Sequence, residues 1–271
     1  MKQISEQTIL ITGSTDGIGK LTALQLAKKN AHVVVHGRNK EKVTKVVEEL
    51  KSESGNDKID GLTADFSSLN EVSKFAEEVL AKYSGLDVLI NNAGVGFADE
   101  RYSKDGYELR FAVNYLAQFL LTRSLLPLLR KSAPSRIVNV SSIGQHPIDF
   151  DDIMLEKSFD SIKSYRQSKL ALIMFTIDLA EELKNENITV NSLHPGTLLN
   201  TNMVRRANMN SMGEPETGAD AEVYLATSES LNGITGRYFN VKTEAKANPD
   251  AYDKEKRKRL HELGLELTSM K

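Results

Sequence analysis

The sequence contains no cysteine. Disulfide bonds, zinc–thiolate sites and cysteine nucleophiles are therefore excluded. The sequence also lacks an excess of either charge. It has 35 basic and 37 acidic residues, for a net charge of -2. Proteins that bind nucleic acid or membrane surfaces normally carry a basic excess, so the composition favours neither class.

Long apolar runs and linkers are absent as well. The apolar stretches are strand-sized or interrupted by charge, and a bilayer span needs roughly 20 apolar residues. No early run resembles a signal peptide or an anchor, so we expect a soluble, cytoplasmic chain without a membrane anchor. No low-complexity or Pro/Gly/Ser-rich segment divides the chain, and we therefore expect a single domain over 1–271, with a helical tail around 250–271.

Short β-branched runs alternate with segments of helical periodicity along the chain. Strands are predicted at 8–12, 32–36, 59–64, 86–90, 136–140, 188–193 and 237–241, and helices at 18–29, 41–51, 69–82, 109–129, 162–183 and 222–227. This alternation predicts an α/β fold: a doubly wound Rossmann domain with about seven mainly parallel strands and helices on both faces. In such sheets, ligands bind at the carboxyl ends of the strands.

A glycine-rich loop, 12–20, follows the first predicted strand. Glycine permits a tight turn and close approach to a phosphate, and the next helix points its free N–H groups at the anion. An ordinary glycine-rich turn is the alternative, but a strand before and a helix after favour a pyrophosphate site. The spacing is not that of a P-loop, which argues against an NTPase. The predicted cofactor contacts here are Gly13, Ser14, Thr15, Gly17, Ile18 and Gly19.

The second predicted strand ends at Gly37-Arg38. In dinucleotide folds an acid at this place holds the ribose 2′-hydroxyl of NAD, whereas an arginine accommodates the 2′-phosphate of NADP. Arg38 therefore predicts NADP(H), with NAD(H) left open and a solvated arginine as the alternative.

Tyr165 and Lys169 are four residues apart in a predicted helix, and so lie on one face. A free tyrosine titrates at about 10, and a neighbouring ammonium favours the phenolate. We therefore expect Lys169 to lower the pKa of Tyr165 and the pair to transfer a proton; two solvated surface residues are the alternative.

These segments closely resemble the short-chain dehydrogenases/reductases, within them the branch of the retinol dehydrogenases and WW-domain oxidoreductase. The resemblance covers essentially the whole chain. It rests on Thr12-Gly13-x-x-x-Gly17-x-Gly19, Asp65, Asn91-Asn92-Ala93-Gly94, Asn114, the run from Arg136 to Ser142, Tyr165-x-x-x-Lys169, His194-Pro195-Gly196 and Gly236-Arg237-Tyr238-Phe239.

The resemblance implies a role for each matching residue. The implied catalytic group is Asn114, Ser142, Tyr165 and Lys169. Asp65 is expected to bond the adenine amino group. Further cofactor contacts are expected from Asn91, Ala93 and Gly94 on the adenosine side, and from Pro195, Gly196 and Thr201 around the nicotinamide. Tyr165 and Lys169 are expected to contact the cofactor as well, with Lys169 holding the hydroxyls of the nicotinamide ribose.

The implied activity is hydride transfer between NADP(H) and a small carbonyl or alcohol substrate, an apolar aldehyde, ketone or secondary alcohol. Tyr165 is expected to act as general acid or base, Ser142 to bond the substrate oxygen and Asn114 to hold a water. The segments 143–164 and 197–215 are expected at the substrate rim. A dinucleotide-binding regulator without turnover is the alternative, and the intact catalytic set argues against it.

Four further expectations concern related enzymes, metals, nucleic acid and oligomers. Protochlorophyllide reductases share much of the pattern but use cysteines, which this chain lacks. No pair among the five histidines has the spacing of metal ligands, so no metal is expected. The charged run 254–259 is expected to be a solvated helical face rather than a nucleic-acid site. Homo-oligomers formed through 109–129 and 162–183 remain open, with a monomer as the alternative.

Overall fold

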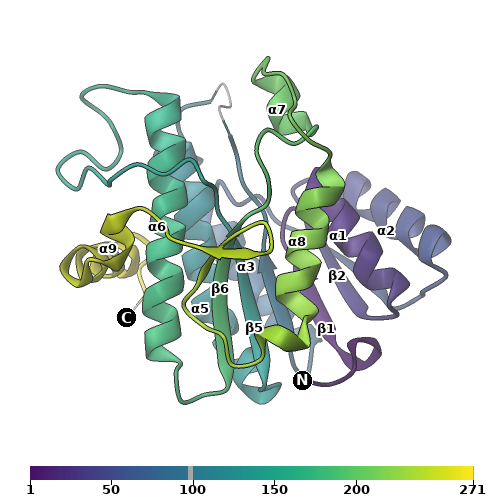
Figure 1. The fold of residues 1–271 in the computed structure, drawn as a ribbon. Coiled ribbons are helices and arrows are strands. Elements are labelled where there is room, and N and C mark those ends of the chain that lie inside the picture. Colours follow the sequence, from purple (N-terminus) through teal and green to yellow (C-terminus); the bar gives the residue numbers. More distant parts are fainter. Residues whose placement is uncertain (97–99, 271) are drawn as a thin grey trace.

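The computed structural model describes residues 1–96 and 100–270 (Figure 1). In this part of the chain, one eight-stranded sheet has the order β3-β2-β1-β4-β5-β6-β7-β8. All neighbours pair in parallel except β7 and β8. The strands are β1 Thr8–Ile11, β2 His32–Gly37, β3 Ile59–Thr63, β4 Val88–Asn91, β5 Ser135–Val140, β6 Ile188–His194, β7 Tyr238–Asn240 and β8 Thr243–Ala245. The α/β prediction is confirmed, with one strand more than expected, because β8 is short and largely exposed and so carries no apolar pattern.

Helices cover both faces of the sheet (Figure 1). One layer contains α1 Gly17–Lys28, α2 Lys40–Ser54 and α8 Pro215–Thr227; the other contains α3 Leu69–Lys82, α4 Leu109–Phe111, α5 Ala117–Lys131 and α6 Ser161–Glu182. Alternate strand residues serve the two layers, since Ile9 and Ile11 belong to one core cluster and Leu10 to the other. Within the described residues no helix has the length and apolar character of a membrane span.

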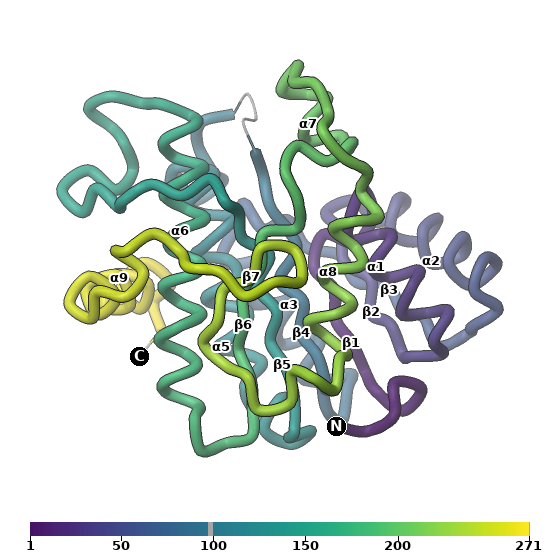
Figure 2. The backbone as a smooth tube through the Cα atoms, viewed as in Figure 1, coloured from purple at the N-terminus to yellow at the C-terminus, as the bar shows by residue number. Residues whose placement is uncertain are grey.

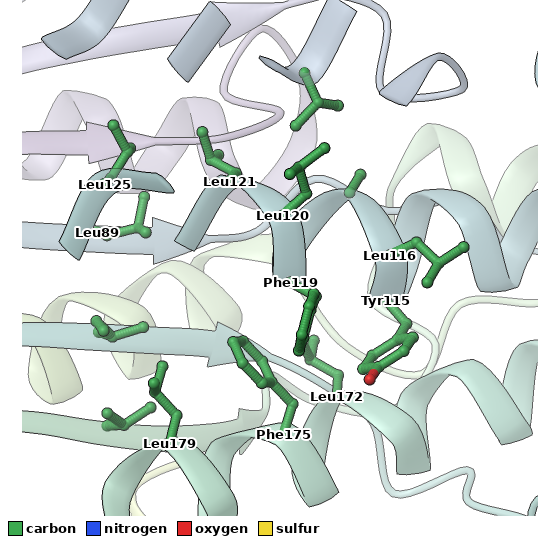
Figure 3. Packing of buried hydrophobic residues seen from close by; sticks show 14 of the residues in the cluster. Leu89, Tyr115, Leu116, Phe119, Leu120, Leu121, Leu125, Leu172, Phe175 and Leu179 are labelled. Carbon is green, nitrogen blue, oxygen red and sulfur yellow. The ribbon is translucent and has the colours of Figure 1, made fainter. Parts of the chain in front are cut away.

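The core on the α5–α6 side is built mainly from leucine and phenylalanine. Figure 3 shows Phe119 of α5 facing Phe175 of α6, with ring centroids 5.0 Å apart, and Leu121 and Leu125 near Leu89 of the sheet. Burying one such side chain stabilises the fold by about 1.5–3 kcal/mol. This packing fixes the position of α6, and with it the predicted Tyr–Lys pair.

Two elements differ from the sequence prediction in ways that matter below. The helix expected over 109–129 contains a π-helical turn, Ala112–Leu116, between α4 and α5. The helix α9, Lys254–Leu267, is not solvated on every side. Arg257 in its charged run is buried, so the expectation of a solvated face is wrong at this residue. Its partners lie on α6, far away in the sequence, and no local pattern reveals them.

Candidate active site

The carboxyl ends of the parallel strands form one edge that brings the predicted site segments together. The register pairs β4 with β1 and β5 and β5 with β6, so the loops that follow these strands start side by side. Figure 2 shows the chain between β5 and α6, and the segment with α7 (Asn202–Arg206), rising from this same edge. Both segments were expected at the substrate rim.

The glycine loop is shaped for close approach of a ligand. Gly13 has φ +65°, and a Cβ on it would lie 2.7 Å from the Cα of Ala93. A Cβ on Gly19 would collide with the side chain of Asn92. Beyond the loop, the first turn of α1 offers N–H groups without intrahelical partners and the positive end of the helix dipole. This donor set fits the pyrophosphate of a dinucleotide.

Asn92, which the sequence analysis did not single out, fastens the glycine loop to the loop after β4. Its Nδ2 donates to the carbonyls of Thr12 at 2.7 Å and Gly13 at 3.1 Å. The hydroxyl of Thr12 in turn accepts from the N–H of Ala93 at 2.9 Å. The hydroxyl of Ser14 is also bonded inside the protein, and its N–H donates to the carbonyl of His36 at 2.9 Å, so both of its donors already have partners within the protein. The remaining loop residues Thr15, Gly17 and Ile18 are half-buried.

The loops after β2 and β3 lie on the expected adenosine side. Arg38 is exposed, and a Cβ on its neighbour Gly37 would lie 2.5 Å from Thr15 of the glycine loop. Burial would raise the pKa of Asp65, but the N–H of Ser67 and the ammonium of Lys104 hold that pKa below its ordinary value. Asp65 is therefore an ionised acceptor, which suits an amino group.

The side chain of Asn91, an expected cofactor contact, points into the core and not towards this site. Its Nδ2 donates to Thr122 at 2.7 Å and to Asn139 at 2.8 Å, and the residue is buried. The cause is strand alternation, which turns the last residue of β4 towards the α5 layer. Ala93 and Gly94 follow the strand and lie at the loop, as predicted.

The catalytic group predicted from Tyr165 is assembled at the start of α6. Asp160 caps this helix by accepting from the N–H groups of Ile162 and Lys163. Tyr165 makes a side-chain hydrogen bond with Ser142. Lys169 lies with Nζ 5.7 Å from the Tyr165 ring centroid and donates to the carbonyl of Val140 at 2.9 Å.

The two serines after β5 have different tasks. The hydroxyl of Ser141 donates to the main-chain carbonyl of Lys169 at 2.7 Å, and so ties α6 to the end of β5. Ser142 is the serine bonded to Tyr165. The structure therefore places Ser142, and not Ser141, beside the hydroxyl of Tyr165.

The charge states differ from the expectation in one respect. Burial raises the pKa of Tyr165 above its ordinary value, and the hydrogen bond with Ser142 only opposes this. Burial also lowers the pKa of Lys169 to about 8, against an opposing effect of Glu222. The expected lowering of the Tyr165 pKa by Lys169 is thus not found. A protonated Tyr165 at neutral pH suits a proton donor.

Asn114 lies within the π-helical turn and is completely buried. Its Nδ2 donates to Ser168 at 2.9 Å and to the carbonyl of Val95 at 3.0 Å, while its Oδ1 accepts from the N–H of Val95 at 2.8 Å. One acceptor position on Oδ1 is left for a water. A Cβ on Gly94 would lie 3.2 Å from Asn114 Oδ1 and 3.4 Å from Lys169 Nζ, so this glycine adjoins both groups.

The segment after β6 reaches the glycine loop. Pro195 and Gly196 follow the strand, half-buried, at the carboxyl edge. Thr201 is near the loop, because a Cβ on Gly17 would lie 3.4 Å from its methyl group. Asn202, which the sequence did not reveal, donates to the carboxylate of Asp16 at 2.5 Å. The region expected as a substrate loop thus contacts the glycine loop.

A glycine loop at the carboxyl edge of a parallel sheet, beside a Ser–Tyr–Lys group whose serine and lysine are buried, defines a dinucleotide-dependent oxidoreductase. The family model for short chain dehydrogenase matches residues 7–211, and the chain belongs to this family. The family resemblance inferred from the motifs is thereby confirmed.

Retinol dehydrogenases are among its relatives. The chain is 36% identical to retinol dehydrogenase 13 of Mus musculus, over 95% of this chain and 82% of the relative. It is 34% identical to polyprenol dehydrogenase of Homo sapiens, over 98% of this chain and 86% of the relative. The protein is therefore a dehydrogenase of the retinol dehydrogenase kind that acts on CH–OH groups of a small-molecule substrate.

Solved structures agree with this assignment. An uncharacterized protein from Mycobacterium paratuberculosis has a TM-score of 0.81 at 26% identity, over 99% of this chain and 96% of that one. The RhlG/NADP active-site complex of Pseudomonas aeruginosa has a TM-score of 0.71 at 28% identity, over 89% of this chain and 97% of that one.

Proposed function

We propose that the protein is an NADP(H)-dependent reductase and dehydrogenase of apolar carbonyl and alcohol substrates, with Tyr165 as its acid and base. The observation that carries this proposal is that the predicted dinucleotide site and the predicted proton-transfer residues lie next to each other. Gly94 is in the loop that adjoins the predicted phosphate site, and a Cβ on it would lie 3.4 Å from Lys169 Nζ and 3.2 Å from Asn114 Oδ1. Proton-transfer groups and a dinucleotide cradle are thus adjacent.

In the reductive direction, Tyr165 gives its hydroxyl proton to the carbonyl oxygen, and in oxidation it takes the proton back from the alcohol. Ser142 bonds the same oxygen and stabilises the charge that develops on it. Lys169 would hold the ribose hydroxyls of the cofactor, and Asn114 would bind the water that links Lys169 to solvent. A bound nicotinamide would supply the hydride for reduction of the carbonyl, or accept it in oxidation of the alcohol.

Two sets of observations support the finer assignments. Arg38 without a neighbouring acid favours NADP(H), and RhlG was solved with NADP. Retinol and polyprenol, which give two relatives their names, are apolar alcohols. Apolar side chains are also exposed on the segments above the site: Ile143, Met203 and Met212.

Changing Tyr165 to Phe tests the proposal, because it removes the hydroxyl and leaves the ring. Turnover of apolar aldehydes and ketones, followed through NADPH absorbance, should fall by about 100- to 10,000-fold. The dissociation constant for NADPH should change by less than about twofold, since the hydroxyl does not hold the phosphates.

The matched control is Tyr102→Phe, a change at an exposed tyrosine. This variant should keep its activity. Undiminished turnover in Tyr165→Phe would rule out the proposed acid, and failure of the wild-type protein to bind either nicotinamide dinucleotide would rule out the function as a whole.

A further inference from the structure

We propose that His36 is a positioning residue for the adenosine half of the cofactor. On this view one neutral imidazole sets the spacing between the glycine loop and the loop that carries Asp65. The inference rests on the proposed dinucleotide site and adds to it a residue that no sequence motif indicates.

His36 is buried near the carboxyl end of β2, and both its ring nitrogens bond main-chain groups. Nδ1 lies 3.0 Å from the N–H of Gly13, and Nε2 lies 3.1 Å from the carbonyl of Ala64. The ring stacks on Phe66 with centroids 4.2 Å apart and is tilted against Phe75 at 4.8 Å. These two hydrogen bonds and two ring contacts fix the orientation of the imidazole.

These contacts allow one protonation state. The N–H of Gly13 donates, so Nδ1 must accept; the carbonyl of Ala64 accepts, so Nε2 must carry the proton. The ring is consequently neutral. Burial supports this state by lowering the pKa of His36 to about 4, although the carbonyl of Ala64 and the charge of Asp65 oppose the shift.

The two main-chain partners belong to the two loops that the adenosine half needs. Gly13 opens the glycine loop and is held at φ +65°, a conformation that glycine adopts readily. Ala64 directly precedes Asp65, the expected adenine contact. Because β2 lies between β1 and β3 in the sheet, a side chain near its carboxyl end can bridge the loops of both neighbours. The imidazole makes this bridge.

Two variants separate the hydrogen bonds from the packing. His36→Phe keeps an aromatic ring but leaves both main-chain groups without a partner, and should weaken binding of 2′,5′-ADP and of NADPH by about tenfold or more. His36→Gln offers one acceptor and one donor and should restore binding to within a few-fold of wild type. The turnover number at saturating NADPH should stay within about twofold in both, because His36 touches no reacting group.

The control is His32→Phe, on the same strand, where the ring is half-buried and its Nε2 meets Asp60 at 3.0 Å. It should leave binding unchanged. Calorimetry with 2′,5′-ADP needs no turnover, so the outcomes are distinct. If wild type binds no adenine nucleotide, the proposed function fails. If wild type and His36→Phe bind equally well, this inference fails.

A measurement on the wild-type protein covers the case in which His36→Phe does not fold. ¹⁵N chemical shifts of the His36 ring at neutral pH should report a protonated Nε2 and an unprotonated Nδ1. A ring protonated on Nδ1, or on both nitrogens, overturns the inference.

Discussion

Arg38 stands directly after β2 and is exposed to solvent, next to a glycine that packs against the phosphate loop. A guanidinium there can meet the 2′-phosphate of NADP, and charge-assisted hydrogen bonds of this type are strong. Changing Arg38 to Ser should therefore raise the dissociation constant for NADPH by about tenfold or more and leave that for NADH nearly unchanged. Fluorescence titration of both cofactors at one ionic strength measures the effect.

The control for this prediction is Lys45→Ser, at an exposed cation on α2 that pairs with Glu49. It should shift neither dissociation constant. Wild-type protein that binds NADH as tightly as NADPH would instead favour the NAD(H)-preferring alternative.

The residues whose roles could be predicted are those whose pattern lies within a short stretch of the sequence. Tyr165 and Lys169 share a helical face by spacing alone, and Gly13 lies between a strand and a helix that the sequence already marks. Asn92 and His36 were missed because their tasks depend on partners about 80 and 23 positions away. The pKa of Tyr165 was wrongly predicted for a related reason: the spacing to Lys169 is visible in the sequence, but the burial that opposes it is not.

At the scale of the elements, the interface between α1 and α8 buries the carboxyl group of Glu222. Glu222 is completely buried and accepts from the hydroxyl of Thr22 at 2.8 Å. Its other oxygen, Oε1, has no hydrogen-bond partner among the described residues. Burial raises the pKa of Glu222 to about 8, against the opposing effects of Thr22 and Lys169. The carboxyl is therefore protonated in the folded protein at neutral pH.

This shift makes stability depend on pH. In the unfolded chain a glutamate ionises near pH 4.3, whereas the folded protein keeps the proton up to about pH 8. Between these values the folded state binds more protons, so Glu222 makes the free energy of unfolding fall as the pH rises. Glu222→Gln cannot ionise, and its stability relative to wild type should increase by about 3–5 kcal/mol from pH 4 to pH 8.

Urea unfolding at the two pH values measures this difference, with Glu216→Gln as control. Glu216 is exposed on the same helix, so its variant should follow the wild-type pH dependence. A stability difference between Glu222→Gln and wild type that does not change with pH would show that the carboxyl ionises normally in the folded state.

The order and type of the main helices and strands could be predicted from the periodicity of apolar residues in the sequence. The π-helical turn and the short elements β8 and α7 could not. The apolar face from Leu109 onward predicts a helix correctly, but the π-helical turn around Asn114 depends on main-chain bonds that side-chain spacing does not reveal. β8 is held by pairing with β7, and its side chains are mostly exposed. Helix α7 is five residues long and buries none of them.

At the scale of the whole molecule, α9 covers the outer groove between α5 and α6. The hydroxyl of Tyr115 donates to the carbonyl of Leu260 at 3.2 Å. A Cβ on Gly264 would lie 2.9 Å from that hydroxyl and 3.2 Å from Phe119, so the helices approach closely. Figure 1 shows α9 beside α6. Pairing of two copies through the long helices, which the sequence left open, would have to displace α9.

Arg257 fastens α9 to α6. Its guanidinium is 2.5 Å from Asp178 and 3.0 Å from Glu181, and it donates to the carbonyl of Ala251. Arg257 is buried and Asp178 is partly buried, so Arg257→Met leaves this carboxylate without its counter-charge and should lower the free energy of unfolding by about 2–4 kcal/mol. Loosening of α9 would also expose the apolar groove.

We therefore expect wild-type protein to be a monomer at micromolar concentration and Arg257→Met to associate. Light scattering coupled to size exclusion measures both masses. Arg259→Met, at the exposed neighbour that pairs with Asp151, is the matched control and should remain monomeric and stable. A wild-type dimer in which α5 and α6 are protected from hydrogen exchange by the second copy would contradict the prediction, because α9 and a partner cannot occupy the same groove.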